Sequence, residues 1–447
     1  MSSHDFIKAA LDRLDEGAVV LRQTHSQNLR WANSALTTNG DMQSTNVTVI
    51  ASAEVDDGTG VGVVSGQVQT DEDAAELANL ARLAAMDASS TDRADLVDAG
   101  ASGNFTEEAE GLDPDTPQRM VEALAVFLDS PAAQFGYAEA SCTTTYMATS
   151  TGTRHRHAQQ AIRFEASARD TSGSTWWGTN SWDAEFSRAA RTQSRDLALQ
   201  AQRESLDPGR YPVILTPSAV ADLLIYLSWS ASGRDAVEGH NVFARAGGGT
   251  RLGEQLSPRD LTLYADPGYQ GLETSDLLVV EANSSMESVF DNGLYLRRQE
   301  LLTAGVLTGL RASRPTADRF GLTPTYLADN LILEDAEGQG SMDDLIARTD
   351  EAVLINCLWY IREVDPQNLL LTGLTRDGVY RVRDGKVVAG LPNFRFNVAV
   401  PDLLGRIRDA SATGPCLPRE WADWFTRTAM PALLVDGFNL SSPSDAR

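Results

Sequence analysis

The sequence predicts an α+β fold with two domains, an N-terminal α/β domain over residues 1–207 and a larger β-rich C-terminal domain over residues 208–447. Three observations support this prediction. In the first half, segments with helical spacing of apolar residues adjoin strand-like segments, which indicates helices flanking a mixed or antiparallel sheet. The second half consists mostly of strand and turn signals. A chain of 447 residues can form two cores, and an Asp-Pro-Gly turn at residues 207–209 marks the boundary.

The first elements are a helix and two groups of strands. Apolar residues at helical spacing predict a helix over residues 6–14. Residues 18–40 are typical of strands and end in a turn at Asn39-Gly40. Residues 46–69 continue as strands around Asp57-Gly58, since Asn-Gly and Asp-Gly are typical hairpin turns.

Two helices follow, separated by an irregular segment. Thr70 is expected to cap a helix, and one face of that helix is predicted to carry Leu77, Leu80, Ala81 and Ala84. Residues 88–115 are rich in Ser and Asp, so we expect an acidic surface loop or linker. Thr116-Pro117 begins the second helix, and its buried stripe is predicted to be Met120, Leu124, Phe127 and Leu128.

The later elements join the two predicted domains. Long strands are expected over residues 135–150 and 154–169, and a helix over about 185–203. Residues 211–215 form a buried strand, which leads into a helix that begins at Thr216-Pro217. The inward face of that helix is predicted to be Val220, Leu223, Leu224 and Leu227. Further on, residues 378–390 predict a hairpin around Asp384-Gly385.

Charge and cysteine content narrow the class of protein. The formal net charge is −25, and Lys8 and Lys386 are the only lysines, so broad binding to a nucleic-acid backbone is not expected. Three widely spaced cysteines make a poor disulfide framework and suit a reducing compartment. Of these, Cys142 and Cys357 are expected to pack in cores. The N-terminus has no signal-peptide pattern and no apolar run is long enough to span a membrane, so we expect a cytoplasmic protein.

Several residues could ligate a metal. A zinc hydrolase needs two or three ligands, an open coordination position and a carboxylate base. His240 lies in a glycine-bounded loop and is either a ligand or an ordinary hydrogen-bonding residue. His155 and His157 share one face of a predicted strand, where they could chelate a metal, although alternating Arg and His favours a solvent-facing strand. Cys416 could be a thiolate ligand, a nucleophile or an ordinary loop cysteine.

The segment Asn393–Asn397, "NFRFN", combines an apolar and a polar face. In a strand, its two phenylalanines share one face, while Asn393, Arg395 and Asn397 share the other. The polar face could line a peptide groove through amide hydrogen bonds. It could equally be the end of an ordinary strand.

Five stretches of the sequence resemble the TldD/PmbA family, whose members are also known as modulators of DNA gyrase. These stretches occur in family order and span nearly the whole chain: "LRWANSALTTNG", "LDPGRYPVILTPSAVADLL", "RLGEQLSPRDLTLYADPG", "LLLTGLTRDGVY" and "GLPNFRFNVAVPDLL". The resemblance implies an α/β domain followed by a β-rich domain of the TldD/PmbA type. It also implies a metallopeptidase subunit, TldD, that pairs with a related subunit, TldE or PmbA, in which the metal motif is absent.

The sequence departs from the family pattern at the metal motif. In the catalytic subunit, a helix carries His-Glu-x-x-x-His and a cysteine ligand follows later. One register places Ser230–Asp235 at this motif, and the other places Asp235–His240 there, with Ala236 at the glutamate position. Both registers lose the first histidine and the general base. A base contributes about 10²–10⁴-fold to rate, so the site is expected to be inert by this mechanism. Cys416 falls near the family's cysteine ligand.

These observations together predict a TldE/PmbA-like subunit with no catalytic residues and no metal of its own. A TldD-like metallopeptidase subunit would carry the zinc, and the pair would bind and cleave unfolded or modified peptides in the cytoplasm. One alternative is an autonomous zinc metallopeptidase with atypical ligands drawn from Asp235, Glu238, His240 and Cys416. Another is a non-hydrolytic, peptide-binding or regulatory homodimer. We expect neither a nucleic-acid nor a membrane partner.

Overall fold

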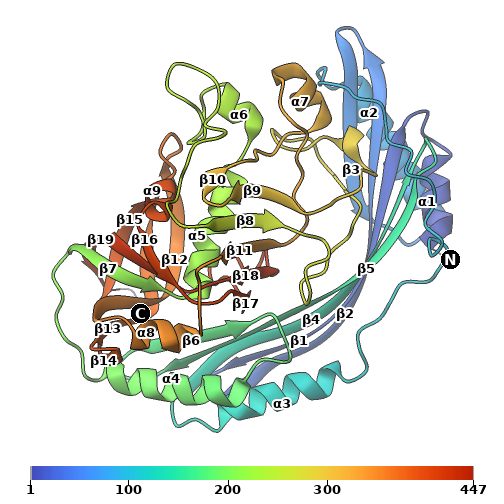
Figure 1. Ribbon diagram of the computed structural model, residues 1–447. Coiled ribbons are helices and arrows are strands. Elements are labelled where there is room, and N and C mark those ends of the chain that lie inside the picture. Colours follow the sequence, from blue (N-terminus) through green and yellow to red (C-terminus); the bar gives the residue numbers. More distant parts are fainter. Residues whose placement is uncertain (1–2, 446–447) are drawn as a thin grey trace.

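The computed structural model describes residues 3–445, which form three sheets (Figure 1). The first sheet is antiparallel, with six strands in the order β3-β2-β1-β4-β5-β6. Its strands are β1 Gly17–Ala32, β2 Ala35–Val55, β3 Gly58–Gln67, β4 Ala133–Thr149, β5 Arg154–Arg169 and β6 Ser174–Thr179. Four of these strands have 16 residues or more, so the sheet extends along one whole side of the molecule (Figure 1).

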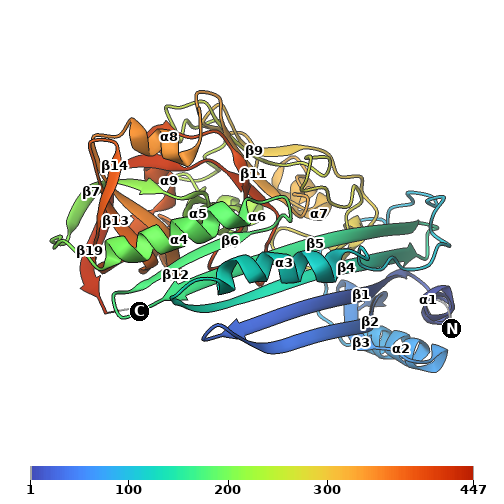
Figure 2. The ribbon, with the colours of Figure 1, turned by 90° about the horizontal axis from the view of Figure 1, so that it is seen from below.

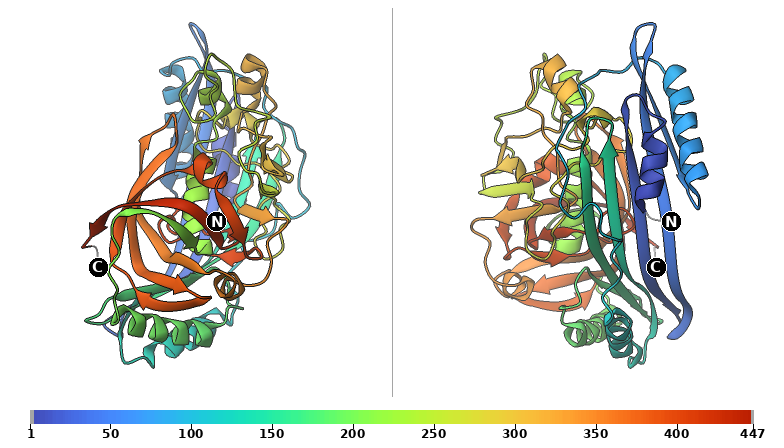
Figure 3. Two further views of the ribbon diagram at one scale, coloured as in Figure 1. Left: turned by 60° about the vertical axis from the view of Figure 1, so that its left-hand side comes forward. Right: turned by 90° about the vertical axis from the view of Figure 1, so that its right-hand side faces the viewer.

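Four helices accompany the first sheet. They are α1 Ser3–Leu11, α2 Asp71–Met86, α3 Thr116–Leu128 and α4 Phe186–Gln200. The right-hand view of Figure 3 shows α1 and α2 on the face turned away from the second half of the chain. Helix α4 contacts α3, and it also contacts strands of both halves (Figure 2). The opposite face of the sheet is therefore the one that meets the second half.

The second half builds the other two sheets. One has the order β10-β9-β8-β11-β18-β17, with strands β8 Leu261–Ala265, β9 Gln299–Thr303, β10 Val306–Leu307, β11 Leu331–Asp335, β17 Gly414–Cys416 and β18 Thr428–Met430. The other has the order β12-β7-β19-β15-β13-β14, with β16 beside β19. Its strands are β7 Gly209–Leu215, β12 Glu351–Asp365, β13 Leu370–Arg383, β14 Lys386–Gly390, β15 Asn393–Ala399, β16 Ile407–Ala410 and β19 Leu433–Ser444. Because β12 also pairs with β13, five strands of this sheet close into a ring.

Helix α5 Pro217–Trp229 lies at the centre of the second half (Figure 1). Thr216 caps it as predicted, by accepting a hydrogen bond from the backbone N–H of Ala219. The predicted inward face is confirmed, and the helix is buried almost all round. A helix that is apolar all round belongs in a core. The shorter helices are α6 Gly233–Val237, α7 Arg314–Phe320, α8 Met342–Ala347, α9 Val400–Leu404 and the 3₁₀ turn Val289–Asp291.

The α+β class and most predicted elements are confirmed, but one predicted turn is wrong. Asn39 and Gly40 lie inside β2, where they pair with residues of β1. The hairpin turns at Asn33 and Ser34, which have φ values of 50° and 60°. A two-residue turn needs positive φ, and Asn adopts it more readily than most residues do. The turns before Gly58 and at residues 384–385 are confirmed.

The predicted apolar face of α2 is confirmed at two positions and wrong at two. Ala81 is buried and Leu77 is half-buried, whereas Leu80 and Ala84 are exposed. The residues that face the sheet are Ala74, Ala78, Ala81 and Ala85. The reason lies in β3, where a Cβ on Gly60 or Gly62 would come within 2.1 Å of a carbonyl oxygen of α2. The helix and the strand approach too closely for leucine, so small residues fill the contact.

The acidic segment, residues 88–115, runs along the first sheet without regular structure. Arg156, whose side chain is buried, donates to the Glu110 carboxylate at 3.2 Å and to the Glu108 carbonyl oxygen at 2.6 Å. The Tyr146 hydroxyl donates to the Glu107 carbonyl oxygen at 2.7 Å. The segment is therefore fastened to the sheet. The division of the chain at residues 207 and 208 stays a prediction.

Candidate functional site

After α5 the chain enters a tight polar turn, which sequence analysis placed at the metal motif. Ser230 ends α5, and the Ser232 hydroxyl accepts a hydrogen bond from the backbone N–H of Asp235 to start α6. The side-chain amide of Asn241 donates to the carbonyl oxygens of Ser230 at 3.0 Å and Ser232 at 2.9 Å. The turn is thus held by hydrogen bonds within the protein.

Three predicted metal ligands lie close together just after this turn. One side-chain donor atom from each of Asp235, Glu238 and His240 can lie within 4.8 Å of the others. Each already has a partner. Ser285 donates to Asp235 at 3.0 Å, Arg234 donates to Glu238 at 3.2 Å, and His240 Nδ1 lies 3.6 Å from Glu238. The His240 side chain is 66% exposed, so this cluster lies at the surface.

Cys416 does not join this cluster. Its Sγ lies 3.6 Å from the carbonyl oxygen of Pro217, the first residue of α5, and 3.3 Å from Thr428 Oγ1. A 13-residue helix is about 20 Å long, so α5 separates Cys416 from Ser230 by that length. Burial raises the pKa of Cys416 to about 12, so the thiol stays protonated.

The segment Asn393–Asn397 forms β15 with the predicted alternation. Phe394 and Phe396 are buried, whereas Arg395 is exposed. The backbone of β15 pairs with β13 on one side and β19 on the other, so no strand edge is open there for a peptide. Recognition by the side chains of Asn393, Arg395 and Asn397 stays a prediction.

A cavity of about 540 Å³ lies between the first sheet and the second half, within the usual range for ligand sites. Its floor is a set of cross-strand rows, in which Arg22 pairs with Thr145 and Thr145 pairs with His157. The other walls include Trp229, Leu278, Arg311, Leu327, Phe425 and Arg427. The end of α5 therefore contributes to the cavity, although the donor cluster after it does not line the cavity.

His155 and His157 face this cavity, and the expectation of a solvent-facing strand is wrong for them. His155 Nε2 lies 3.3 Å from Ser275 Oγ, and His157 Nε2 lies 3.2 Å from the Gln159 side chain. Burial lowers the pKa of both imidazoles, so both are neutral at pH 7. Together they supply polar groups without adding charge.

A second hollow, of about 800 Å³, adjoins the first along the same sheet. Ser141 and Ala161 line both hollows, and they are direct partners in the pairing of β4 with β5. Residues from both halves of the chain line the second hollow, among them Arg30, Trp31, Tyr137, Arg163, Arg419 and Asp423.

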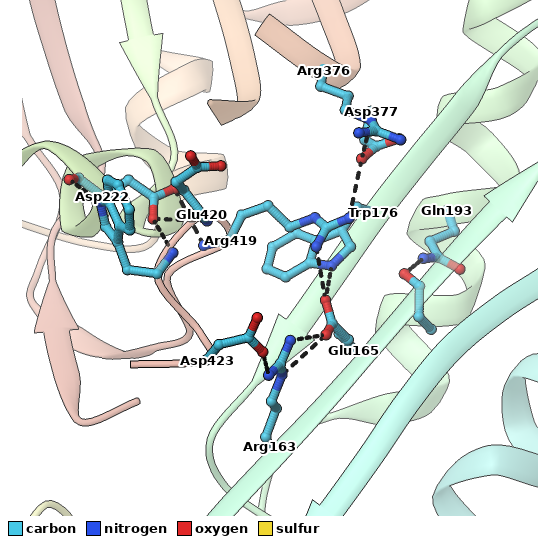
Figure 4. A network of polar contacts seen from close by, with 12 residues as sticks. Arg163, Glu165, Trp176, Gln193, Asp222, Arg376, Asp377, Arg419, Glu420 and Asp423 are labelled. Carbon is cyan, nitrogen blue, oxygen red and sulfur yellow. Dashed lines mark hydrogen bonds and ion pairs between the residues drawn. The ribbon is translucent and has the colours of Figure 1, made fainter. Parts of the chain in front are cut away.

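A buried ionic network borders the second hollow and joins the two halves (Figure 4). The carboxylate of Glu165 on β5 accepts hydrogen bonds from Arg163 at 2.6 Å, Trp176 at 3.0 Å and Arg419 at 3.1 Å. Arg163 also pairs with Asp423. Two buried guanidinium groups therefore share one carboxylate, which fixes the segment of residues 419–423 against the sheet.

Asp222 holds the same segment from the α5 side (Figure 4). Its carboxylate is fully buried and accepts hydrogen bonds from the backbone N–H groups of Arg419 at 3.2 Å, Glu420 at 3.0 Å and Trp421 at 3.4 Å. Burial raises the pKa of Asp222 well above its usual range. The Glu420 carboxylate in turn accepts from the backbone N–H of Ile361 at 3.0 Å.

A family model described as the PmbA/TldA metallopeptidase C-terminal domain matches residues 208–442, more than half of the chain. This chain belongs to the PmbA/TldD family. Three solved structures have the same fold, and each aligns with 98% of this chain. TldE from Thermococcus kodakarensis has a TM-score of 0.75 at 15% identity, with 99% of that chain covered.

The other two similar structures are both described as putative modulators of DNA gyrase. The one from Thermotoga maritima has a TM-score of 0.71 at 16% identity, with 99% of that chain covered. The one from Bacteroides thetaiotaomicron has a TM-score of 0.72 at 14% identity, with 98% covered. No curated protein matches the sequence. No helix in residues 3–445 is long and apolar enough to cross a membrane.

The donor cluster of this PmbA/TldD chain does not fit a catalytic zinc. Asp235, Glu238 and His240 supply one imidazole and two carboxylates on an exposed loop, and Arg234 already binds Glu238. A hydrolytic site also needs a base beside an open coordination position. Within residues 3–445, no further histidine, cysteine or carboxylate joins this cluster.

Most residues of the cavity and of the ionic network are not predicted by the sequence. Arg22, Arg311 and Arg427 are isolated in the sequence, and no motif contains them. A usable signal did exist in the strands, because the polar residues at 141, 143 and 145 and at 155, 157 and 159 recur with a period of two. That pattern predicts a polar face of the sheet, but it does not predict which segment packs over that face.

Proposed function

We propose that this chain is a TldE/PmbA-like subunit without a hydrolytic centre of its own. It acts in the cytoplasm with a TldD-like metallopeptidase subunit that supplies the zinc, and it helps to bind unfolded or modified peptides. One observation supports the proposal: neither Ser230–Asp235 nor Asp235–His240, the two registers for the family's metal motif after α5, contains the first histidine and the glutamate base. The cavity beside this segment supports a role in peptide binding.

The test is reconstitution with a TldD-like subunit from the same source. The two chains should elute together in size-exclusion chromatography, and the mixture should cleave an unfolded peptide faster than the TldD-like chain does alone. This chain alone should not cleave, and it should contain no stoichiometric zinc. If the two chains elute separately and the cleavage rate is unchanged, the proposal is refuted. Sedimentation of the chain alone shows whether it forms the alternative homodimer.

The alternative function, an autonomous zinc peptidase, would have to use the cluster of Asp235, Glu238 and His240, whose exposed ligand set does not fit a catalytic zinc. An autonomous zinc peptidase would retain about one zinc per chain after dialysis, and His240→Ala would remove both the zinc and the activity. His25→Ala is a matched control, because His25 pairs with Asp41 on another part of the surface. Retention of activity in His240→Ala would rule this candidate out.

A further inference from the structure

The two hollows meet at a pair of small residues. Ser141 and Ala161 are direct cross-strand partners and line both hollows. The segment Trp421–Arg427 also borders both. It is tied down where Asp423 pairs with Arg163 and where Arg427 Nη2 donates to the carbonyl oxygen of Gln160 at 2.8 Å. The segment Trp421–Arg427 therefore forms an arch over the part of the floor where the side chains are small.

Guanidinium groups line both hollows, with Arg22 and Arg311 in the first and Arg419 in the second. Arg311 pairs with Glu287 at 2.5 Å, and Arg419 pairs with Glu165 at 3.1 Å. The ion-pair partner of Arg22 is Glu281, at 3.6 Å, which is beyond hydrogen-bond distance. The Arg22 side chain is 39% exposed, so its guanidinium is available to a ligand that carries a carboxylate.

We infer that the two hollows form one channel that holds an extended peptide and binds a free carboxylate of that peptide at the Arg22 and Arg311 end. This inference deepens the proposed function and rests on its peptide-binding part. Along β5, residues from His155 to Ala161 line the first hollow and residues from Ala161 to Ser167 line the second. The floor therefore advances twelve strand steps, about 40 Å, and about twelve extended residues would span both hollows. A guanidinium binds a carboxylate through paired hydrogen bonds.

Binding to the isolated chain tests the channel. The probes are three fluorescein-labelled, unstructured decapeptides of Gly, Ser and Ala: one with a Glu and an amidated C-terminus, one with Gln in its place and the same amide, and one with Gln and a free C-terminal carboxylate. Fluorescence anisotropy should show at least tenfold tighter binding for one or both carboxylate peptides than for the neutral peptide. The tighter carboxylate peptide identifies whether the source is a side chain or the C-terminus. Equal affinity for all three, or no binding, overturns the inference.

Two pairs of variants locate the binding. Ala161→Phe fills the narrow floor and should weaken binding at least tenfold, whereas Ala84→Phe, at an exposed position of α2, should change it less than twofold. Arg22→Gln should abolish the preference for carboxylate peptides. Arg82→Gln, on α2 and away from the channel, should preserve it. Unchanged binding in Ala161→Phe overturns the inference.

A thiol-protection measurement covers the case in which Ala161→Phe does not fold. The three native cysteines are free and buried, so the introduced thiol of Ser141→Cys should be the reactive one. A carboxylate peptide should slow its labelling by a maleimide at least fivefold, and unchanged labelling would contradict the channel. These binding assays contain no TldD-like subunit. A negative result would therefore refute the channel but not the proposed function, which co-elution and cleavage with the TldD-like subunit test separately.

Discussion

Replacing Glu165 with Gln should destabilise the contact between the two halves of the chain. The Glu165 side chain is 9% exposed, and those of Arg163 and Arg419 are 16% and 15% exposed, so the substitution leaves two guanidinium groups short of their shared anion. Loss of one partner from a buried ion pair costs about 3–5 kcal/mol. Arg163 keeps Asp423, and Arg419 keeps Asp377 at 3.8 Å, so we expect the lower end, about 3 kcal/mol.

Urea unfolding followed by tryptophan fluorescence measures this loss. Trp176 donates to Glu165 and so reports on the network directly. The matched control is Asp12→Asn. It removes an ion pair with Lys8 whose two side chains are 76% and 61% exposed, so it should cost far less than Glu165→Gln. If Glu165→Gln loses no more free energy of unfolding than the control, the network does not fasten the two halves.

Three further predictions concern pH and backbone geometry. Burial lowers the pKa of His155 and His157, so the unfolded chain binds protons that the folded chain does not as pH falls below about 6.5. The urea midpoint should therefore fall through that window, and replacing both with Gln should flatten the fall. Gly62→Ala should lower the free energy of unfolding in urea by about 1–3 kcal/mol, because the new Cβ would lie 2.1 Å from a carbonyl oxygen of α2. Gly103→Ala is the control and should be neutral, because no atom lies within 4 Å of its Cβ position. Asn33→Val should lower the thermal midpoint by the equivalent of about 1–2 kcal/mol, because φ is 50° there.

Local signals in the sequence predicted most of the fold. The capping residue Thr216 predicts the helix that follows it, and the turn pair Asp384-Gly385 predicts the hairpin. The predicted turn at Asn39-Gly40 is wrong because Asn33 and Ser34 form the turn instead. The hairpin register then follows from that turn. The predicted face of α2 is wrong at Leu80 and Ala84, because the approach of Gly62 to that helix is a tertiary contact that the local pattern does not encode.

The candidate site was less predictable than the fold, for a physical reason. The spacing of donors in the sequence brought Asp235, Glu238 and His240 together correctly, since they lie within six residues. The family resemblance places Cys416 near a cysteine ligand, yet the length of α5 separates it from these three residues. The cavity depends on which layer covers the polar face of the sheet, and no local pattern encodes that.

The arch made by Trp421–Arg427 also has a consequence during synthesis. Arg163 meets Asp423 across 260 residues of sequence, and Glu165 meets Arg419 across 254. A chain that emerges from the ribosome N-terminus first can form the long hairpins of the first sheet early, since their pairings are local. The part of that sheet around Arg163 and Glu165 then stays uncovered until the last few dozen residues are made. During that interval a nascent chain is exposed to misassociation, and truncation near the C-terminus should leave it in that state permanently.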